Sequence, residues 1–149
     1  MLTPILTALL AVLVFVLTQS FLKLVLEPIQ EQRRLIGEVA HALVFYANVY
    51  HVTAFGTPDE RRIEELEEAR KALRNLAGQL RASLWTVPFY DALARVGWVP
   101  RKQDVLEAAT QLIGWSTSLY GSTGDGAREK RRTIIADRLG ITKLLEEAS

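Results

Sequence analysis

Residues 4–26 read PILTALLAVLVFVLTQSFLKLVL, and this stretch decides the fold because Lys23 is its only charged residue. As a helix rising 1.5 Å per residue, these 23 residues would be about 35 Å long. A hydrocarbon core is about 30 Å thick, so such a helix can span it with some tilt. Thr3 is placed to cap the helix, and Pro4 fits its first turn. We therefore predict a transmembrane anchor helix in residues 1–27.

A cleaved signal peptide is the competing interpretation of this stretch. It would have a basic start, a shorter apolar run and a small-x-small cleavage site. Here Leu2 and Thr3 are uncharged, and the polar end of the run reads TQSF at residues 18–21. The sequence favours a retained anchor.

Basic residues lie on one side of the predicted span. Lys23 lies at its C-terminal end, Arg33 and Arg34 follow it, and only the α-amino group lies at its N-terminal end. Positively charged flanks stay in the cytoplasm. We expect residues 28–149 to form a cytoplasmic domain behind a single span.

A stripe of small and hydroxylated residues runs along the predicted span at helical spacing. Such residues let helices approach closely in lipid, which favours a homo-oligomer. In the alternative, each threonine bonds its own backbone and the face points at lipid. Gln19 would either line a polar pore mouth or meet headgroups. The predicted transmembrane interface comprises Thr7, Ala11, Val14, Thr18 and Gln19.

The chain beyond the span has the periodicity of helices, and no alternating run predicts a strand. Pro28 marks either a kink or the first turn of a new helix. Residues 35–55 are apolar enough to raise the question of a second span. Four polar residues argue against that span, because each is costly near a bilayer centre: Glu38, His41, Asn48 and His51.

Further helices follow at glycine and proline breaks. A long helix is expected after Thr57 and Pro58, a short aromatic helix over residues 85–96 around Pro88, and another from Gln103. After the loop GSTGDG at residues 121–126, a last long helix over 127–139 is expected to end at Gly140. Apolar residues at helical spacing predict the buried faces: Ile63, Leu66, Leu73, Leu76, Ala77, Leu80 and Leu84; then Val105, Ala108, Ala109, Leu112, Ile113, Ser116 and Leu119.

The predicted fold class is therefore all-α, with an N-terminal transmembrane helix continuing into a cytosolic helical bundle. Gly37 and Gly114 interrupt helical patterns at a cost of about 1 kcal/mol each, which close helix contact would explain. We expect the two glycines to face each other.

Composition excludes some chemistry. There is no cysteine, so disulfides and thiolate metal sites are ruled out. The formal net charge of +1 gives no overall attraction to nucleic acid or acidic lipid. The chain has no GxSxG elbow, phosphate-binding loop with its lysine, or HExxH zinc helix. We expect no enzyme, no metal and no cofactor.

The two histidines offer the one residual catalytic hypothesis. His41 and His51 are ten residues apart, about 80° from facing each other on a helix, and are not expected to share a metal. Glu38 lies one turn before His41, where it would form a hydrogen-bonded structural pair or, in the catalytic alternative, an acid–base dyad.

The C-terminal helix is locally basic, with five bases against Glu129 and Asp137 giving a local charge of +3. Such a patch would bind a nucleotide, a short oligonucleotide or the inner leaflet; the alternative is a solvated face. The candidate anion-binding residues are Arg128, Lys130, Arg131 and Arg132, with Arg101 and Lys102 added. The GSTGDG loop could hold phosphate at a helix N-terminus, but Asp125 counts against that. Four aromatics would stack on bases or belong to the core: Tyr46, Tyr50, Trp115 and Tyr120.

Two stretches resemble a group of small bacterial proteins with one N-terminal span: FLKLVLEPIQEQRRLIGEVAHALVFYANV at residues 21–49, and GWSTSL at residues 114–119, followed by a loop and a basic helix. The resemblance covers roughly half of the chain and implies a bacterial inner-membrane protein with a helical cytosolic domain. It provides no active site. The layout is also similar to that of membrane effectors in phage defence that respond to a nucleotide signal.

Two functional hypotheses follow. In the first, the protein is a non-enzymatic oligomeric membrane effector: an anionic signal binds the basic residues and changes the packing of the anchors, which opens a channel or disrupts the membrane. In the second, it is a membrane-tethered adaptor that recruits a cytosolic protein partner.

Overall fold

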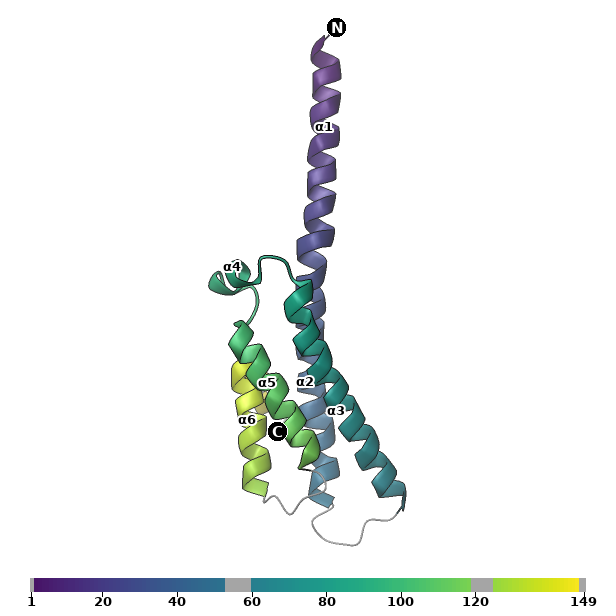
Figure 1. Cartoon of the computed structure of the whole chain (residues 1–149), viewed down its shortest axis with the longest axis vertical. Helices are drawn as coiled ribbons and strands as arrows, with labels where there is room; N and C mark the ends of the chain where they lie inside the picture. Colours follow the sequence, from purple (N-terminus) through teal and green to yellow (C-terminus); the bar gives the residue numbers. More distant parts are fainter. Residues whose placement is uncertain (1, 53–59, 119–124, 148–149) are drawn as a thin grey trace.

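The computed structural model describes residues 2–52, 60–118 and 125–147, and within these ranges every regular element is helical (Figure 1). The all-α prediction is confirmed. The expected cap and first turn at Thr57 and Pro58 lie outside the described residues, as does most of the 121–126 loop. The elements are α1 (Leu2–Phe21), η1 (Leu22–Leu26), α2 (Glu27–Val52), α3 (Glu60–Thr86), α4 (Tyr90–Arg95), α5 (Lys102–Thr117), α6 (Asp125–Leu139) and α7 (Thr142–Glu147).

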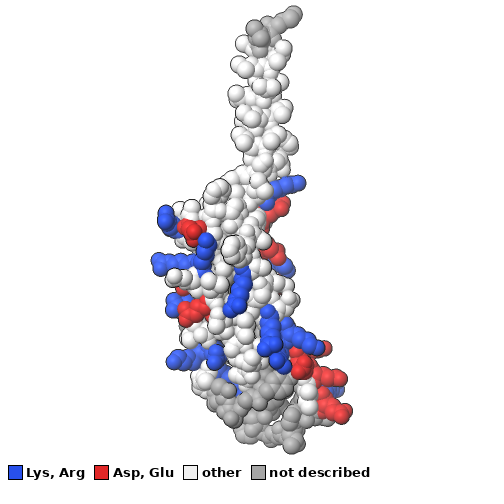
Figure 2. Space-filling model, viewed as in Figure 1, with Lys and Arg blue, Asp and Glu red and all other residues white. Residues whose placement is uncertain are grey.

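The first three elements form one long helix, of which α1 projects clear of the rest of the protein (Figure 1). Figure 2 shows that this projecting part carries no charged side chain. Within the described residues, the helix Thr3–Ala47 is the one helix long and apolar enough to cross a membrane. The predicted single N-terminal span is confirmed to this extent.

Pro28 does not separate the span from the domain. Pro28 lies in the first turn of α2. The five-residue π-helix η1 precedes it, and at the end of η1 the Glu27 N–H donates to the carbonyl of Leu22. A proline cannot donate to the carbonyl four residues back, and its ring crowds that carbonyl. Widening the preceding turn relieves the conflict. The helix therefore continues from the span into the domain.

The domain is a bundle in which α3 packs against α2 and α5, and α5 packs against α6. Its core takes fully buried side chains from each long helix: Val39 and Leu43 from α2, Leu73 and Leu80 from α3, Leu112 from α5 and Ile135 from α6. Leu35, Val39 and Leu43 of the rejected second span thus lie in this core. The predicted faces of α3 and α5 are confirmed except at Ile63, which is 42% exposed. Leu119 lies outside the described residues.

The predicted short helix over residues 85–96 is wrong in its start. α3 continues to Thr86, and α4 begins only at Tyr90. Pro88 restricts the residue before it to extended conformations, and Phe89 adopts a left-handed conformation (φ 51°), so residues 87–89 form a turn. Gly140 ends α6 with φ 70°, as predicted from the sequence.

The expected contact between Gly37 and Gly114 is also wrong. Gly37 has open space where a side chain would be, because it lies on the exposed side of α2. Gly114 lies on the side of α5 that faces α6, and a Cβ there would clash with the guanidinium of Arg131. The missing side chain of Gly114 thus makes room for an arginine.

Candidate functional site

The predicted transmembrane interface lies on α1, where every described side chain is exposed in the single chain. The hydroxyl of Thr7 donates to the carbonyl of Thr3 at 2.9 Å, and that of Thr18 donates to the carbonyl of Val14 at 2.8 Å. The threonines can therefore face lipid or another helix without an unsatisfied donor. Gln19 is exposed about 100° around the helix from Thr18 and is thus off the stripe. The interface stays a prediction.

The six candidate anion-binding residues fall into two groups instead of one patch. α5 and α6 run antiparallel, because Arg128 Nη2 donates to the carbonyl of Ser118 at one end and Arg138 pairs with Asp104 at the other. Arg101 and Lys102, at the start of α5, therefore lie beside the end of α6. Ten residues of α6 separate Arg128 from Arg138, which is about 15 Å.

The group on α6 lies at the end of the bundle that is far from the span (Figure 1). Two of its arginines hold α5. Arg128 bonds Ser118 at 3.0 Å, and Arg131 lies over Gly114 and donates to Gln111 Oε1 at 3.1 Å. Arg132 is only 20% exposed and pairs with Glu129 at 3.5 Å, whereas Lys130 is exposed. Much of the predicted basic face is thus used in packing, and its binding role stays a prediction.

The second group lies near the end of the bundle that is next to α1. Lys102 Nζ is 3.1 Å from Asp91 Oδ2 and 5.7 Å from the centre of the Tyr90 ring. An open cavity of about 690 Å³ lies between α4 and the start of α5, and it is lined by Asp91, Ala94, Arg95, Arg101, Lys102 and Gln103. Three cations and one carboxylate line it, a net charge of +2 that favours an anionic ligand.

A second open cavity, of about 500 Å³, lies beside the first. Arg33, Arg101 and Arg138 contribute to its wall, but Asp104 and Asp137 do so as well. Arg138 also pairs with Glu107 at 2.9 Å. Its mixed charge makes it a weaker candidate for an anion.

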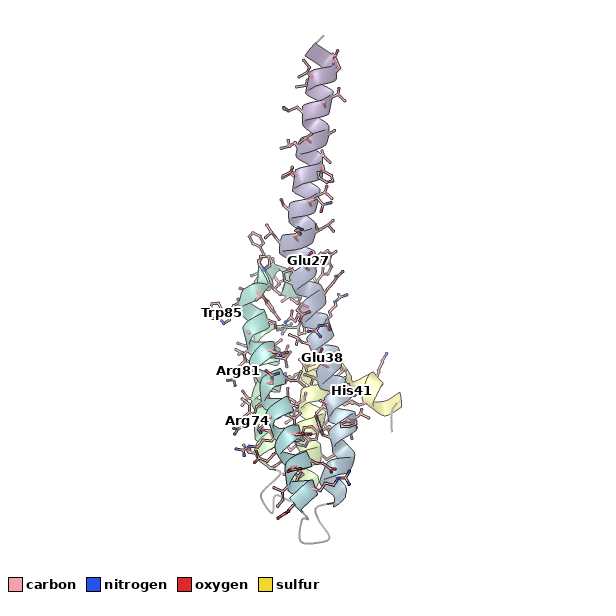
Figure 3. The ribbon with its side chains drawn as sticks, turned by 90° about the vertical axis from the view of Figure 1, so that its right-hand side faces the viewer. Glu27, Glu38, His41, Arg74, Arg81 and Trp85 are labelled. Carbon is pink, nitrogen blue, oxygen red and sulfur yellow. The ribbon has the colours of Figure 1, made fainter. Side chains whose placement is uncertain are left out.

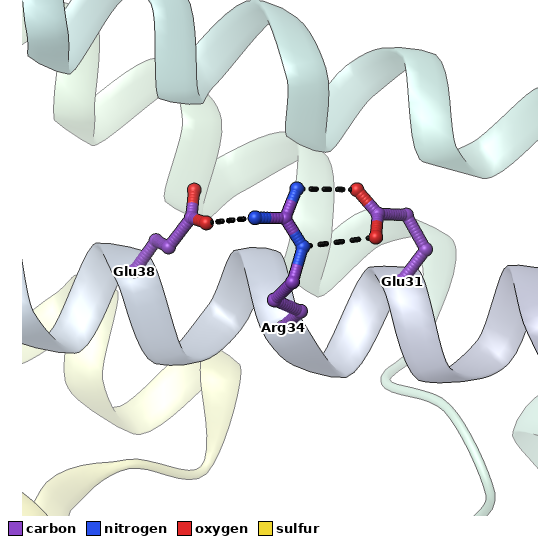
Figure 4. Close-up of polar contacts among 3 residues, drawn as sticks. All are labelled: Glu31, Arg34 and Glu38. Atoms are coloured by element: carbon purple, nitrogen blue, oxygen red, sulfur yellow. Dashed lines mark hydrogen bonds and ion pairs between the residues drawn. The ribbon is translucent and has the colours of Figure 1, made fainter.

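The Glu38–His41 pair is not formed. Glu38 accepts a hydrogen bond from Arg34, which also bonds Glu31 through two atoms at 2.7 and 2.9 Å (Figure 4). His41 instead stacks on Phe45 at 5.8 Å between ring centres. The bond to Arg34 lowers the pKa of Glu31, and Glu31 in turn raises the pKa of Arg34. This exposed network keeps its charges and resembles no acid–base dyad.

The remaining aromatic and histidine candidates are either covered by the bundle or not described. Trp115 is 2% exposed, so its ring is not available to stack on a base. Tyr46 is half-buried beside Phe45. The side chains of Tyr50, His51 and Tyr120 lie outside the described part of the chain. Among the described residues, no group of three or more His, Cys, Asp or Glu residues could hold a metal ion.

A buried polar contact fixes α4 against α2. Gln32 is fully buried, and its Nε2 donates to the hydroxyl of Tyr90 at 2.7 Å. Nearby, Arg33 Nη2 donates to the carbonyl of Trp98 at 3.3 Å. Burial raises the pKa of Tyr90, Asp104 and Asp91 add to this rise, and the bond from Gln32 opposes it. The phenol therefore favours its neutral form in the folded state.

This raised pKa predicts a loss of stability in alkali. The native state holds the Tyr90 proton more tightly than the unfolded state does. The contribution of Tyr90 to the free energy of unfolding is therefore complete below about pH 10 and is lost as the pH rises above it. We expect the melting temperature of the full-length protein in detergent to fall more steeply above about pH 10 than that of Tyr90→Phe. Tyr46→Phe is the control and should keep the steep fall. Parallel curves for the native protein and Tyr90→Phe would contradict the assignment.

Exposed aromatic residues at the same end of the bundle were missed at the sequence level. Trp85 is 91% exposed and projects outward from the upper part of α3 (Figure 3), while Phe89 is 80% and Trp98 46% exposed. The signal that could have revealed them is a pair of tryptophans near two bases in sequence: Trp98 lies between Arg95 and Arg101, and Trp85 precedes Arg95 by ten residues.

No protein-family model matches the chain, and no curated protein or solved structure is significantly similar to it. The proposed function therefore rests on the protein's own geometry and on the resemblance in layout. Three features bear on it: an exposed apolar helix, its unbroken continuation into the bundle, and a basic, aromatic surface at the junction.

Proposed function

We propose that the protein is a non-enzymatic, oligomeric membrane effector, anchored by one span in the bacterial inner membrane with its bundle in the cytoplasm. In this proposal, contacts among bundles and a bound anionic signal set the packing of the anchor helices, and that packing permeabilises the membrane. The role in phage defence and the nucleotide-type signal follow from the resemblance in layout.

The unbroken helix from Thr3 to Ala47 is the observation that carries this proposal. Leu35, Val39 and Leu43 fix its second half in the bundle core, and the same helix forms the span. A rotation or tilt of the bundle would therefore be transmitted to the span directly. A flexible linker would not couple the two in this way.

The exposure of α1 supports oligomerisation. Apolar side chains such as Leu9 (68%) and Phe15 (64%) need a cover of lipid or of other helices. The stripe of Thr7, Ala11 and Val14 is the face on which two helices could come closest, since its side chains are small.

The charges at the junction support a cytoplasmic bundle. Lys23 lies at the C-terminal end of the span, Arg33 and Arg34 follow it in sequence, and the fold brings Arg95 and Arg101 to the same end of the bundle. Bases near a span favour the cytoplasmic side. For an anionic signal, the exposed candidates are Lys130 on α6 and Arg101 with Lys102 on α5, because Arg128 and Arg131 have partners within the bundle.

Cysteine cross-linking tests the oligomer, since the chain has no cysteine of its own. We expect Val14→Cys to form covalent dimers on oxidation in membranes and Val16→Cys to form few. The two valines are 54% and 51% exposed, and they lie about 200° apart on α1, so residue type and exposure are matched while the face differs. Cells producing the native protein should also take up a membrane-impermeant dye.

Equal cross-linking at the two positions would contradict the predicted face, and no cross-linking together with no dye uptake would overturn the effector. The membrane-tethered adaptor would then be the better account. Phe45 supports that alternative: it is 59% exposed and stacks on His41 on α2, which is an aromatic surface suited to a cytosolic protein partner.

A further inference from the structure

The connection from the end of α3 to the start of α5, residues 85–102, forms a corner. One side of it packs against α2, and the side chains on its other side are exposed. We call it the α4 corner. Its fixed side is a small second core in which Val87, Tyr90 and Val99 pack with Ile29 of α2. The polar bonds from Gln32 to Tyr90 and from Arg33 to Trp98 strengthen the same side. The corner is thus held in one position relative to the long helix.

That position is the end of the apolar span. The uncharged run ends at Leu26, apart from Lys23, whose long side chain can reach toward water. The second core touches the helix at Val25 and Ile29, on either side of Leu26. In Figure 1 the turn between α3 and α4 lies level with the junction of η1 and α2. With the span in a membrane, the corner lies at the headgroup layer.

The bare side of the corner is apolar and aromatic. Trp85, Phe89, Val96 and Trp98 are all exposed, whereas the rest of the bundle buries most of its large apolar side chains. Phe89 occupies a left-handed conformation that is rare for an aromatic residue, and this conformation accompanies a ring that is 80% exposed. Tryptophan and other aromatic rings are enriched where proteins meet the membrane–water interface.

The charges of the corner match an anionic surface. Residues 85–102 contain three bases and one acid, a net charge of +2. The bases Arg95, Arg101 and Lys102 line the open cavity of about 690 Å³, so they converge on one place. Figure 2 shows basic side chains at this upper end of the domain, below the uncharged span. Bases beside a span are attracted to anionic headgroups.

We propose that the α4 corner docks on the headgroup layer of the membrane: its aromatic side chains lie at the interface, and Arg95, Arg101 and Lys102 bind the phosphate of anionic phospholipids. The occupant is a lipid surface because the patch combines apolar rings and bases, and because it lies beside the end of the span. The inference rests on the span of the proposed function. It assigns Arg101 and Lys102 to lipid, which leaves Lys130 on α6 as the exposed candidate for the anionic signal. It adds a second, lipid-dependent contact that fixes how the bundle sits on the membrane.

Tryptophan quenching tests the position of the corner. The full-length protein is reconstituted into vesicles whose lipids carry a nitroxide on the headgroup, and Trp85 and Trp98 should be quenched. Trp115 is the internal reference, since it is buried and lies 13 residues along α5 from Lys102, about 20 Å. The double variant Trp85→Phe with Trp98→Phe should lose most of the quenching. The same quenching in both proteins would overturn the docking.

The lipid charge tests the basic cavity. Replacing part of the phosphatidylcholine by phosphatidylglycerol should increase the quenching, and Arg95→Gln with Arg101→Gln should abolish that increase. Lys71→Gln with Arg74→Gln on α3 removes the same charge from exposed positions away from the corner (Figure 3 labels Arg74), and the increase should remain. An increase that survives the first pair of changes would overturn the lipid-binding role.

Two further measurements separate the alternatives. Added phosphate distinguishes binding to a lipid surface from binding to a free anion, and vesicle flotation shows whether the protein has a span at all. Inorganic phosphate should reverse the quenching no more than sodium chloride of the same ionic strength; a larger reversal would identify a site for free anions and overturn the lipid assignment. Protein that does not float with the vesicles would refute the span, and the inference with it. Protein that floats with Trp85 and Trp98 unquenched would refute the docking alone.

Discussion

Replacing Leu13 and Leu17 by arginine is expected to release the protein from the membrane. Both residues lie near the middle of the apolar run and are exposed on α1, at 56% and 61%. An arginine at the centre of a span costs about 2.5–3.5 kcal/mol in membrane insertion, and each leucine lost removes roughly a further 0.5 kcal/mol. Two such changes oppose insertion by about 6–8 kcal/mol. Resistance to alkaline extraction and flotation with vesicles measure the outcome.

The matched control places the same chemistry outside the membrane. Leu106→Arg puts an arginine on the exposed side of α5, where water can solvate it, so the protein should remain in the membrane fraction. If the double arginine variant stayed resistant to extraction while its bundle remained folded, α1 would not be a lipid-facing span.

The span and the long helices were predictable because they depend on local pattern. The apolar character of the run from Pro4 to Leu26 can be read from the sequence whatever the helix packs against. The three- and four-residue spacing of Leu73, Leu80 and Leu112 with their apolar neighbours likewise indicates a buried face before the adjacent helix is known. The effect of Pro28 was harder to predict. A helix can break, kink or continue at a proline, depending on the geometry of the turn before it. Here the π-helix η1 provides the wider turn that lets the helix continue.

The basic residues show where sequence reasoning reaches its limit. Counting charges on the last helix treats each base as available, whereas Arg131 is directed at Gly114, seventeen positions earlier. Arg138 similarly pairs with Asp104 on α5. Both contacts depend on how α5 and α6 pack, which no local pattern specifies. An arginine with a partner inside the bundle cannot be told from a free one by its spacing.

The aromatic residues show the opposite case, in which side chains that the sequence places in the core can be exposed. Trp115 has helical spacing with its neighbours and is buried, as the core alternative holds. Trp85 follows Leu84 at the end of the same kind of pattern but is almost fully exposed, because it lies on the outer face of α3 with Arg81 and Ala82. Only the fold places Trp85 and Trp98 beside the end of the span. The membrane-facing corner therefore could not be assembled from the sequence alone.

Replacing Leu112 by alanine is expected to lower the free energy of unfolding of the bundle by about 2–5 kcal/mol. Leu112 is fully buried in α5, the helix that packs against both α3 and α6, so the cavity left by its side chain would open at the centre of the core. Small domains are stable by only about 5–15 kcal/mol, so this loss is a large share of the total. Denaturant unfolding of the full-length protein in detergent, followed by helical circular dichroism, measures it.

The control for this change is Leu106→Ala on the same helix. Its side chain is 43% exposed, so alanine there removes less buried surface and leaves no closed cavity; the loss should be well below that at Leu112. Both changes keep helix propensity nearly constant, because leucine and alanine are both strong helix formers. The difference between the two variants therefore reports packing alone. Equal losses would mean that α5 does not lie between α3 and α6. The bundle would then lack the rigid core that is needed to transmit a rotation or tilt to the span.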